Sequence, residues 1–119
     1  MRITSGGNVG IGTSAPDAAL DVHGPVKMLG AWQSYSQGTV YQAATDGFVV
    51  AYDYWEGQGG YVNGITDSSS NPTTMRIQNG GPSTNAAGIN MPVRKGDYWK
   101  VTITSGGWYP HVFWIPLGQ

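Results

Sequence analysis

The stretch GFVVAYDYW, residues 47–55, shows the period-two alternation of a β-strand more strongly than any other part of the sequence. Successive side chains of a strand point to opposite faces, so the even-numbered residues share one face: Phe48, Val50, Tyr52 and Tyr54. The odd-numbered residues share the other face: Val49, Ala51, Asp53 and Trp55. Both faces are apolar as far as Ala51, which predicts that the first half of this strand is buried on both sides.

Similar strand-length runs, separated by glycine, proline and polar turn residues, lie on either side of this stretch. They cover residues 26–35, 39–44, 61–66, 73–78, 89–93, 98–103 and 108–117. The segment NGGPSTNAA, residues 79–87, predicts a long loop. Seven or eight short strands at this spacing predict an all-β fold, either a β-sandwich or a jelly roll.

The composition supports the same fold class. The 119 residues include ten valines, seven isoleucines and ten threonines, but only three leucines and one glutamate. Strand-forming residues therefore dominate, which excludes a helical bundle and argues against a Rossmann-type fold. Only 11% of the residues are charged, which is about half of the usual share in a soluble domain.

The beginning of the chain differs from the rest and predicts a separate segment, residues 1–25, before a head at residues 26–119. Residues 1–24 contain five glycines and no aromatic residue, and their apolar residues are isolated. Two short alternating runs, 8–13 and 19–23, flank a turn at 14–17. So few apolar side chains cannot bury a core within one chain. The segment is therefore either a disordered leader or a thin strand segment that is ordered only against copies of itself.

The string GGNVGIGTSAPDAALDVHG, residues 6–24, resembles an element of bacteriophage tail fibres and tailspikes with the pattern G-N-V-G-I-G-T-x-x-P-x-x-x-L-x-V-x-G. In those proteins the element forms the end of the shaft before a head. Three further strings resemble the carboxy-terminal tip domains of tail fibres: ATDGFVVAY (44–52), MPVRKGDYWKV (91–101) and VFWIPLG (112–118).

The resemblance implies a parallel homotrimer, in which a short intertwined shaft leads into three β-sandwich heads. Four aliphatic residues would form the shaft interface: Val9, Ile11, Leu20 and Val22. The tip would lie on the virion, at the end of the tail fibre, and would bind a host-cell surface glycan or lipopolysaccharide during extracellular attachment. Two alternatives stay open, namely a structural cap that registers the three chains and a tip that hydrolyses glycans.

The candidate receptor-binding residues lie in or beside predicted turns and strand ends: Asp53, Tyr54, Trp55, Glu56, Tyr61, Asn63, Trp108 and Tyr109. Loops on a rigid sandwich carry binding residues disproportionately. Carboxylate oxygens accept hydrogen bonds from sugar hydroxyls, and aromatic faces pack on sugar C–H groups. Burial in the core is an equal alternative for each aromatic residue. Asp53 and Glu56 could form a hydrolytic pair, but solvated carboxylates at a strand end explain them better, so the prediction is a binding protein and not an enzyme.

Metal or cofactor chemistry is not predicted. The chain has no cysteine, and His23 and His111 are its only histidines. Three copies of His23 on a trimer axis could chelate a metal, but no second ligand lies at a suitable spacing. Asp67 and Asn71 could supply oxygen ligands to calcium, although an ordinary polar turn is the simpler interpretation.

The charge pattern also limits the partners. The net charge of −1 gives no basis for binding nucleic acid. No stretch approaches the roughly 20 apolar residues that membrane insertion requires. The one adjacent basic pair, Arg94 and Lys95, predicts a solvated hairpin tip or, alternatively, a contact to an anionic glycan.

Overall fold

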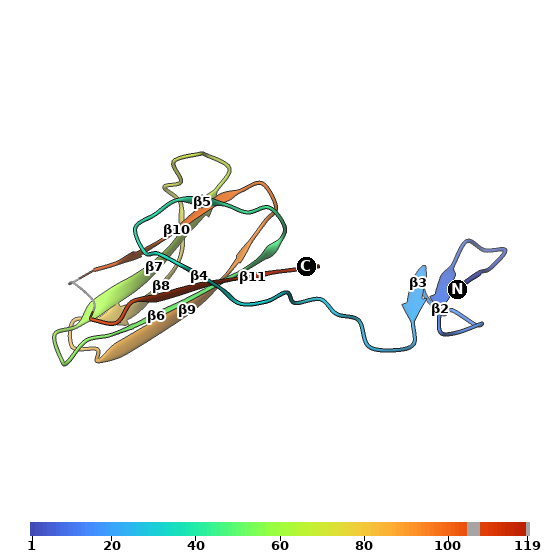
Figure 1. Ribbon diagram of the computed structural model, residues 1–119, viewed down its shortest axis with the longest axis horizontal. Helices are drawn as coiled ribbons and strands as arrows, with labels where there is room; N and C mark the ends of the chain where they lie inside the picture. Colours follow the sequence, from blue (N-terminus) through green and yellow to red (C-terminus); the bar gives the residue numbers. More distant parts are fainter. Residues whose placement is uncertain (105–107, 119) are drawn as a thin grey trace.

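The computed structural model describes residues 1–104 and 108–118, and these residues form eleven β-strands and no helix. Figure 1 shows a small sheet at the amino-terminal end and a larger head, joined by an extended stretch of chain. The predicted all-β class is therefore confirmed. Within the described residues, no helix is long and apolar enough to cross a membrane.

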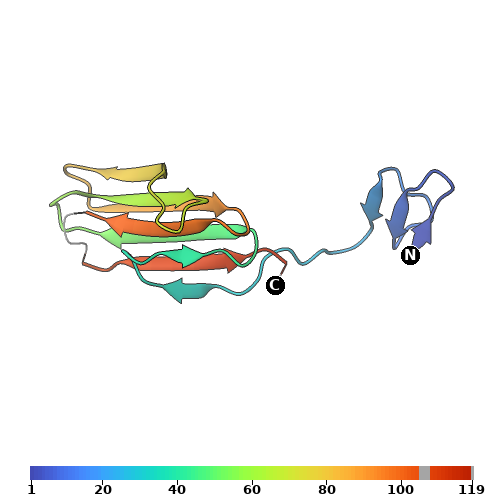
Figure 2. The same ribbon diagram turned by 90° about the horizontal axis from the view of Figure 1, so that it is seen from above.

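The head consists of two four-stranded antiparallel sheets in a sandwich-like arrangement, with strands that run along the long axis of the molecule (Figure 2). One sheet has the order β5-β10-β7-β8, with the bounds Tyr41–Gln42, Tyr98–Ile103, Gly60–Asp67 and Met75–Gly81. The other has the order β4-β11-β6-β9, with the bounds Gln33–Tyr35, His111–Pro116, Gly47–Tyr54 and Ala86–Val93.

The core lies between these sheets and is rich in tryptophan. Trp55, Trp99 and Trp114 are all buried. The rings of Trp99 on β10 and Trp114 on β11 stack with their centroids 5.8 Å apart, which joins the two sheets. Small and aliphatic residues from both sheets surround them: Val49, Ala51, Val62, Ile89, Met91, Val93, Val101 and Val112.

Strand β6 follows the predicted alternation. Its odd-numbered residues are buried in the core, whereas Tyr52 and Tyr54 are exposed. Phe48 and Val50 are half-buried. The predicted burial of the first half of this strand on both sides is therefore incomplete within one chain.

The prediction of a long loop at residues 79–87 is wrong. β8 ends at Gly81 and β9 begins at Ala86, so only residues 82–85 connect them. Gly80 pairs with Tyr61, and a Cβ atom on Gly80 would collide with the carbonyl oxygen of Gly60. The glycines that suggested a loop therefore permit the close approach of two paired strands. The runs at 26–35 and 39–44 are also shortened, to β4 and β5 respectively.

The two outer faces of the head differ in chemistry. On the β5-β10-β7-β8 sheet, Asn63 accepts a hydrogen bond from Gln78 (2.8 Å) and donates one to Thr102 (3.2 Å), and Lys100 lies nearby on β10. On the other sheet, the outward positions of the described strands carry no Asp, Glu, Lys or Arg. Its outward side chains are mostly aromatic or aliphatic: Phe48, Val50, Tyr52, Tyr54, Phe113 and Ile115, with Trp32 packed edge-on against Phe113. We call this surface the aromatic face.

The amino-terminal sheet has the order β1-β2-β3, formed by Arg2–Ile3, Val9–Ile11 and Leu20–Val22. Val9 lies opposite both Ile3 and Leu20, and Ile11 lies opposite Val22. The four predicted shaft residues therefore share one face of this sheet with Ile3. Ile3, Ile11 and Leu20 are 64%, 45% and 62% exposed. The segment forms a sheet whose aliphatic face is uncovered within one chain.

Replacing Trp99 by alanine tests the position of the core. Because the indole is buried and stacked on Trp114, we expect the free energy of unfolding to fall by about 3–5 kcal/mol in urea denaturation. Trp108→Ala, at an exposed tryptophan, is the control and should change it by less than about 0.5 kcal/mol. Equal losses in the two variants would contradict this core.

Candidate functional site

The connections from β6 to β7 and from β8 to β9 meet at the end of the head that lies away from the amino-terminal sheet, together with Thr104 after β10 and residues 108–110 before β11 (Figure 1). We call this the distal end. Backbone hydrogen bonds link the connections to one another and to the strands. The amide of Trp55 donates to the carbonyl oxygen of Asn85, and the amide of Thr104 donates to the carbonyl oxygen of Tyr61 (3.0 Å). The distal end is therefore a braced surface rather than a set of independent loops.

Five of the eight predicted receptor-binding residues lie at this end with side chains that reach the surface. Tyr54, Trp108 and Tyr109 are 42%, 45% and 61% exposed. Glu56 is also exposed, and Tyr61 is half-buried. A backbone hydrogen bond from the amide of Trp108 to the carbonyl oxygen of Tyr54 (3.4 Å) brings these two exposed aromatic residues together from segments more than 50 residues apart in the sequence.

The side chains of the other three predicted residues are buried, those of Asp53 and Trp55 inside the head and that of Asn63 on the outer face of the β5-β10-β7-β8 sheet. Asp53, Trp55 and Asn63 are 1%, 0% and 8% exposed. Asp53 is an odd-numbered residue near the end of β6, so the alternation of the strand directs it inward, and Trp55, directly after the strand, continues the same parity into the core. Asn63 is covered because it is hydrogen-bonded between Gln78 and Thr102.

These buried side chains support the surface above them. Oδ1 of Asp53 accepts hydrogen bonds from the amides of Tyr54 (2.6 Å) and Tyr109 (2.9 Å). The indole nitrogen of Trp55 donates to the carbonyl of Thr104 (3.2 Å). Asp53 therefore ties both exposed tyrosines to the core through their backbone.

The positions of Asp53 and Glu56 bear on the alternative in which the tip hydrolyses glycans. Glycoside hydrolysis by two carboxylates requires both groups to reach the scissile bond. Asp53 is buried and bonded to backbone amides, whereas Glu56 is exposed. The two carboxylates considered from the sequence do not meet at one surface.

The histidines have local partners. Nε2 of His23 lies 3.4 Å from Oδ1 of Asp21. His111 stacks on Tyr52, with centroids 4.6 Å apart and an interplanar angle of 6°, and its Nδ1 lies 2.7 Å from the carbonyl oxygen of Tyr109. Among residues 1–104 and 108–118, no three His, Cys, Asp or Glu side chains cluster closely enough to hold a metal ion.

Asp67 organises the turn that follows β7. Its carboxylate accepts hydrogen bonds from the amides of Ser69 (2.9 Å), Thr73 (3.0 Å) and Thr74 (3.0 Å). These bonds, first of all the one from Thr73, hold the pKa of Asp67 well below its usual range. The side chain of Asn71 is not part of this set, so the segment has the hydrogen bonds of a polar turn.

The sequence alone does not predict that the residues of the aromatic face form one surface. The parity of Phe48, Val50 and Tyr52 within one strand is visible in the sequence. What the sequence does not display is the register that places His111 beside Tyr52 and Phe113 beside Val50.

Comparison of this chain with protein-family models, with curated proteins and with solved structures finds no match. The residues of the distal end, their geometry and the resemblance of residues 6–24 therefore indicate the function.

Asp53→Ala tests the brace at the distal end. The variant leaves the amide of Tyr109 without its acceptor, so we expect faster hydrogen exchange at that amide and a loss of about 1–3 kcal/mol of stability. Glu56→Ala removes an exposed carboxylate from the same end and should leave the exchange of Tyr109 unchanged. Unaltered exchange of Tyr109 in Asp53→Ala would show that the brace does not exist.

The turn at Asp67 should withstand acid. Because its pKa is lower in the folded than in the unfolded chain, its stabilising contribution is complete above about pH 4 and is lost only as the pH falls through the lower folded value. An NMR titration should show Asp67 protonating at a lower pH than a model peptide aspartate. In Asp67→Asn, the amide shifts of Ser69, Thr73 and Thr74 should lose their common acid-induced change. Titration of Asp67 near pH 4 would contradict the three hydrogen bonds.

Proposed function

We propose that this protein is the tip of a bacteriophage tail fibre, which attaches the virion to a glycan or lipopolysaccharide on the host-cell surface. The observation that carries the proposal is the gathering of exposed aromatic side chains at the distal end, opposite the segment that resembles a fibre shaft. Tyr54, Trp108 and Tyr109 offer faces for sugar C–H groups, and Glu56 offers acceptors for hydroxyls. No covalent step is involved.

A homotrimer is part of the proposal. The aliphatic face of the amino-terminal sheet and part of the aromatic face of the head, at Trp32, Tyr52 and Tyr54, are exposed within one chain. Burial of apolar area contributes roughly 25 cal/mol per Å², so parallel association that covers these faces is favourable. Three distal ends would then point the same way, and weak glycan contacts would combine into strong attachment by avidity.

A structural cap that registers three chains is the second candidate, and the same two apolar faces favour it. The two candidates differ at the distal end. A cap requires the faces that meet other copies, but it does not require exposed Trp108 and Tyr109.

The double variant Trp108→Ala, Tyr109→Ala separates them. We expect the unaltered protein to block adsorption of the phage to its host cells and to bind a host glycan on an array. The double variant should lose at least about tenfold in both measurements, because stacking on aromatic faces is removed at every copy. Met75→Ala, at an exposed apolar residue at the other end of the head, is the control. If the double variant blocks adsorption as well as the unaltered protein, the distal end is not the binding surface.

A further inference from the structure

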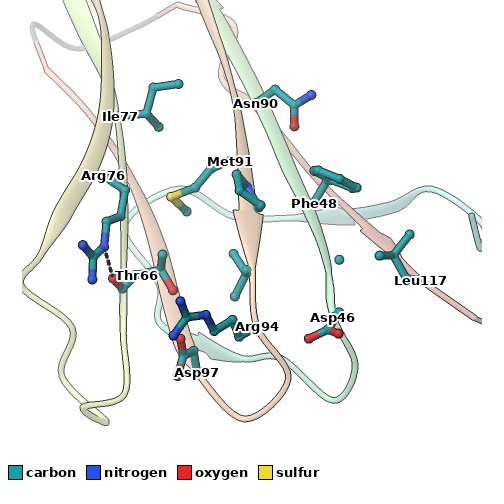
Figure 3. A pocket seen from close by; sticks show the side chains of 13 residues that line it. Asp46, Phe48, Thr66, Arg76, Ile77, Asn90, Met91, Arg94, Asp97 and Leu117 are labelled. Atoms are coloured by element: carbon teal, nitrogen blue, oxygen red, sulfur yellow. Dashed lines mark hydrogen bonds between the residues drawn. The ribbon is translucent and has the colours of Figure 1, made fainter.

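A pocket of about 600 Å³ lies along one side of the head, where β8 and β9 are the edge strands of their sheets. Figure 3 shows that its lining residues fall on both sides of β9. Phe48, Asn90 and Leu117 lie toward the aromatic face. Arg76, Ile77, Met91 and Arg94 lie on the opposite side, between the sheets. The inference concerns this second part, which we call the edge pocket.

Two arginines reach the edge pocket from different strands. Arg76 lies where the pairing of β7 with β8 shifts register, between Gly64 and Ile65. A bulge of this kind redirects a side chain, and Nε of Arg76 donates to the carbonyl oxygen of Thr66 (3.3 Å). Arg94 directly follows β9, and its guanidinium extends toward the side of Thr66 and Asp97 (Figure 3).

Neither guanidinium is neutralised by a direct contact in the part of the chain that the structure describes. The one ion pair within 4.0 Å there joins His23 to Asp21, far away in the amino-terminal segment. Asp97 also lines this part of the pocket, whereas Asp46 lies on the other side of β9, toward Phe48 and Leu117 (Figure 3). The arginines therefore retain N–H donors for a ligand.

The pocket combines three kinds of surface. Arg76 and Arg94 supply positively charged donors, Asp97 supplies acceptors, and the side chains of Ile77 and Met91 supply an apolar wall. A simple inorganic anion would use only the two arginines, and an apolar ligand would use only the wall formed by Ile77 and Met91. A neutral sugar would leave the two guanidinium groups without an anionic partner.

We propose that the edge pocket binds an acidic sugar residue. Its anionic group, a carboxylate or a phosphate, is held between Arg76 and Arg94, since guanidinium groups pair with both. Ring hydroxyls donate to Asp97, and the C–H face of the ring packs against Ile77 and Met91. The inference rests on the proposed function for its biological setting, and it adds a second glycan site on the side of the head with a defined ligand chemistry.

The first test is an NMR titration of the full chain with glucuronic acid, glucose 6-phosphate and glucose. We expect at least one acidic sugar to shift the backbone amides of Thr66, Arg76 and Arg94, and glucose to leave them unchanged. The tighter of the two acidic sugars identifies the anionic group. Equal shifts with glucose, or no shifts with either acid, would overturn the proposal.

The second test uses matched variants. Arg76→Gln and Arg94→Gln should each weaken binding by at least about tenfold, because a hydrogen bond to a charged group is lost. Lys95→Gln makes the same charge change next to Arg94 but outside the pocket lining, and it should bind as the unaltered chain does. All three side chains are exposed, so circular dichroism should show folded variants. Equal weakening by Lys95→Gln would indicate a diffuse charge effect and overturn the site.

The two proposals fail separately. Loss of acidic-sugar binding in a protein that still blocks phage adsorption would overturn the edge pocket alone. Acidic-sugar binding by a protein that neither blocks adsorption nor attaches to host cells would overturn the tail-fibre proposal and leave the pocket in place.

Discussion

The strands of the head direct alternate side chains into a core between two sheets. This alternation determines which of the candidate binding residues reach the surface. In β6, the burial of Asp53 and Trp55 directs the neighbouring Tyr54 outward. Asp53 then holds the amide of Tyr109 from below, so an internal carboxylate fixes an exposed aromatic residue on another connection. A surface braced in this way would lose little conformational freedom on binding a ligand. The rigidity of the distal end therefore follows from the packing of the core.

The same constraint produces two unlike outer faces. Asn63, Gln78 and Thr102 form a hydrogen-bonded polar row on one sheet, as expected for a face in water. The other sheet presents the aromatic face, and the amino-terminal sheet presents a row of aliphatic residues. A protein with few charged residues and two uncovered apolar faces is better suited to an assembly than to a solitary chain. Assembly and attachment would then use adjoining surfaces of one small head, which meet at Tyr54.

The sequence predicts the class of fold and much of its strand pattern, because period-two alternation and turn residues are local signals. The strands at 47–54 and 98–103 and the shared parity of Tyr52 and Tyr54 follow from them. Both parities of residues 47–51 are apolar, so the sequence does not tell which side of β6 faces the core and leaves both burial and ligand contact open for Trp55, which the structure places in the core. The glycines at 80–81 resemble a loop although they lie in paired strands. The aromatic face and the bulge at Arg76 depend on the register between paired strands. This register is set by tertiary packing, so no local sequence pattern predicts it.

The central claim is that the two apolar faces are covered by further copies of the chain, which makes the protein a trimeric tip. Light scattering of the purified protein across the micromolar range tests it most directly. The account predicts a mass three times the 12.6 kDa of one chain, with unfolding that depends on protein concentration. A stably folded species with the mass of one chain at these concentrations would contradict it.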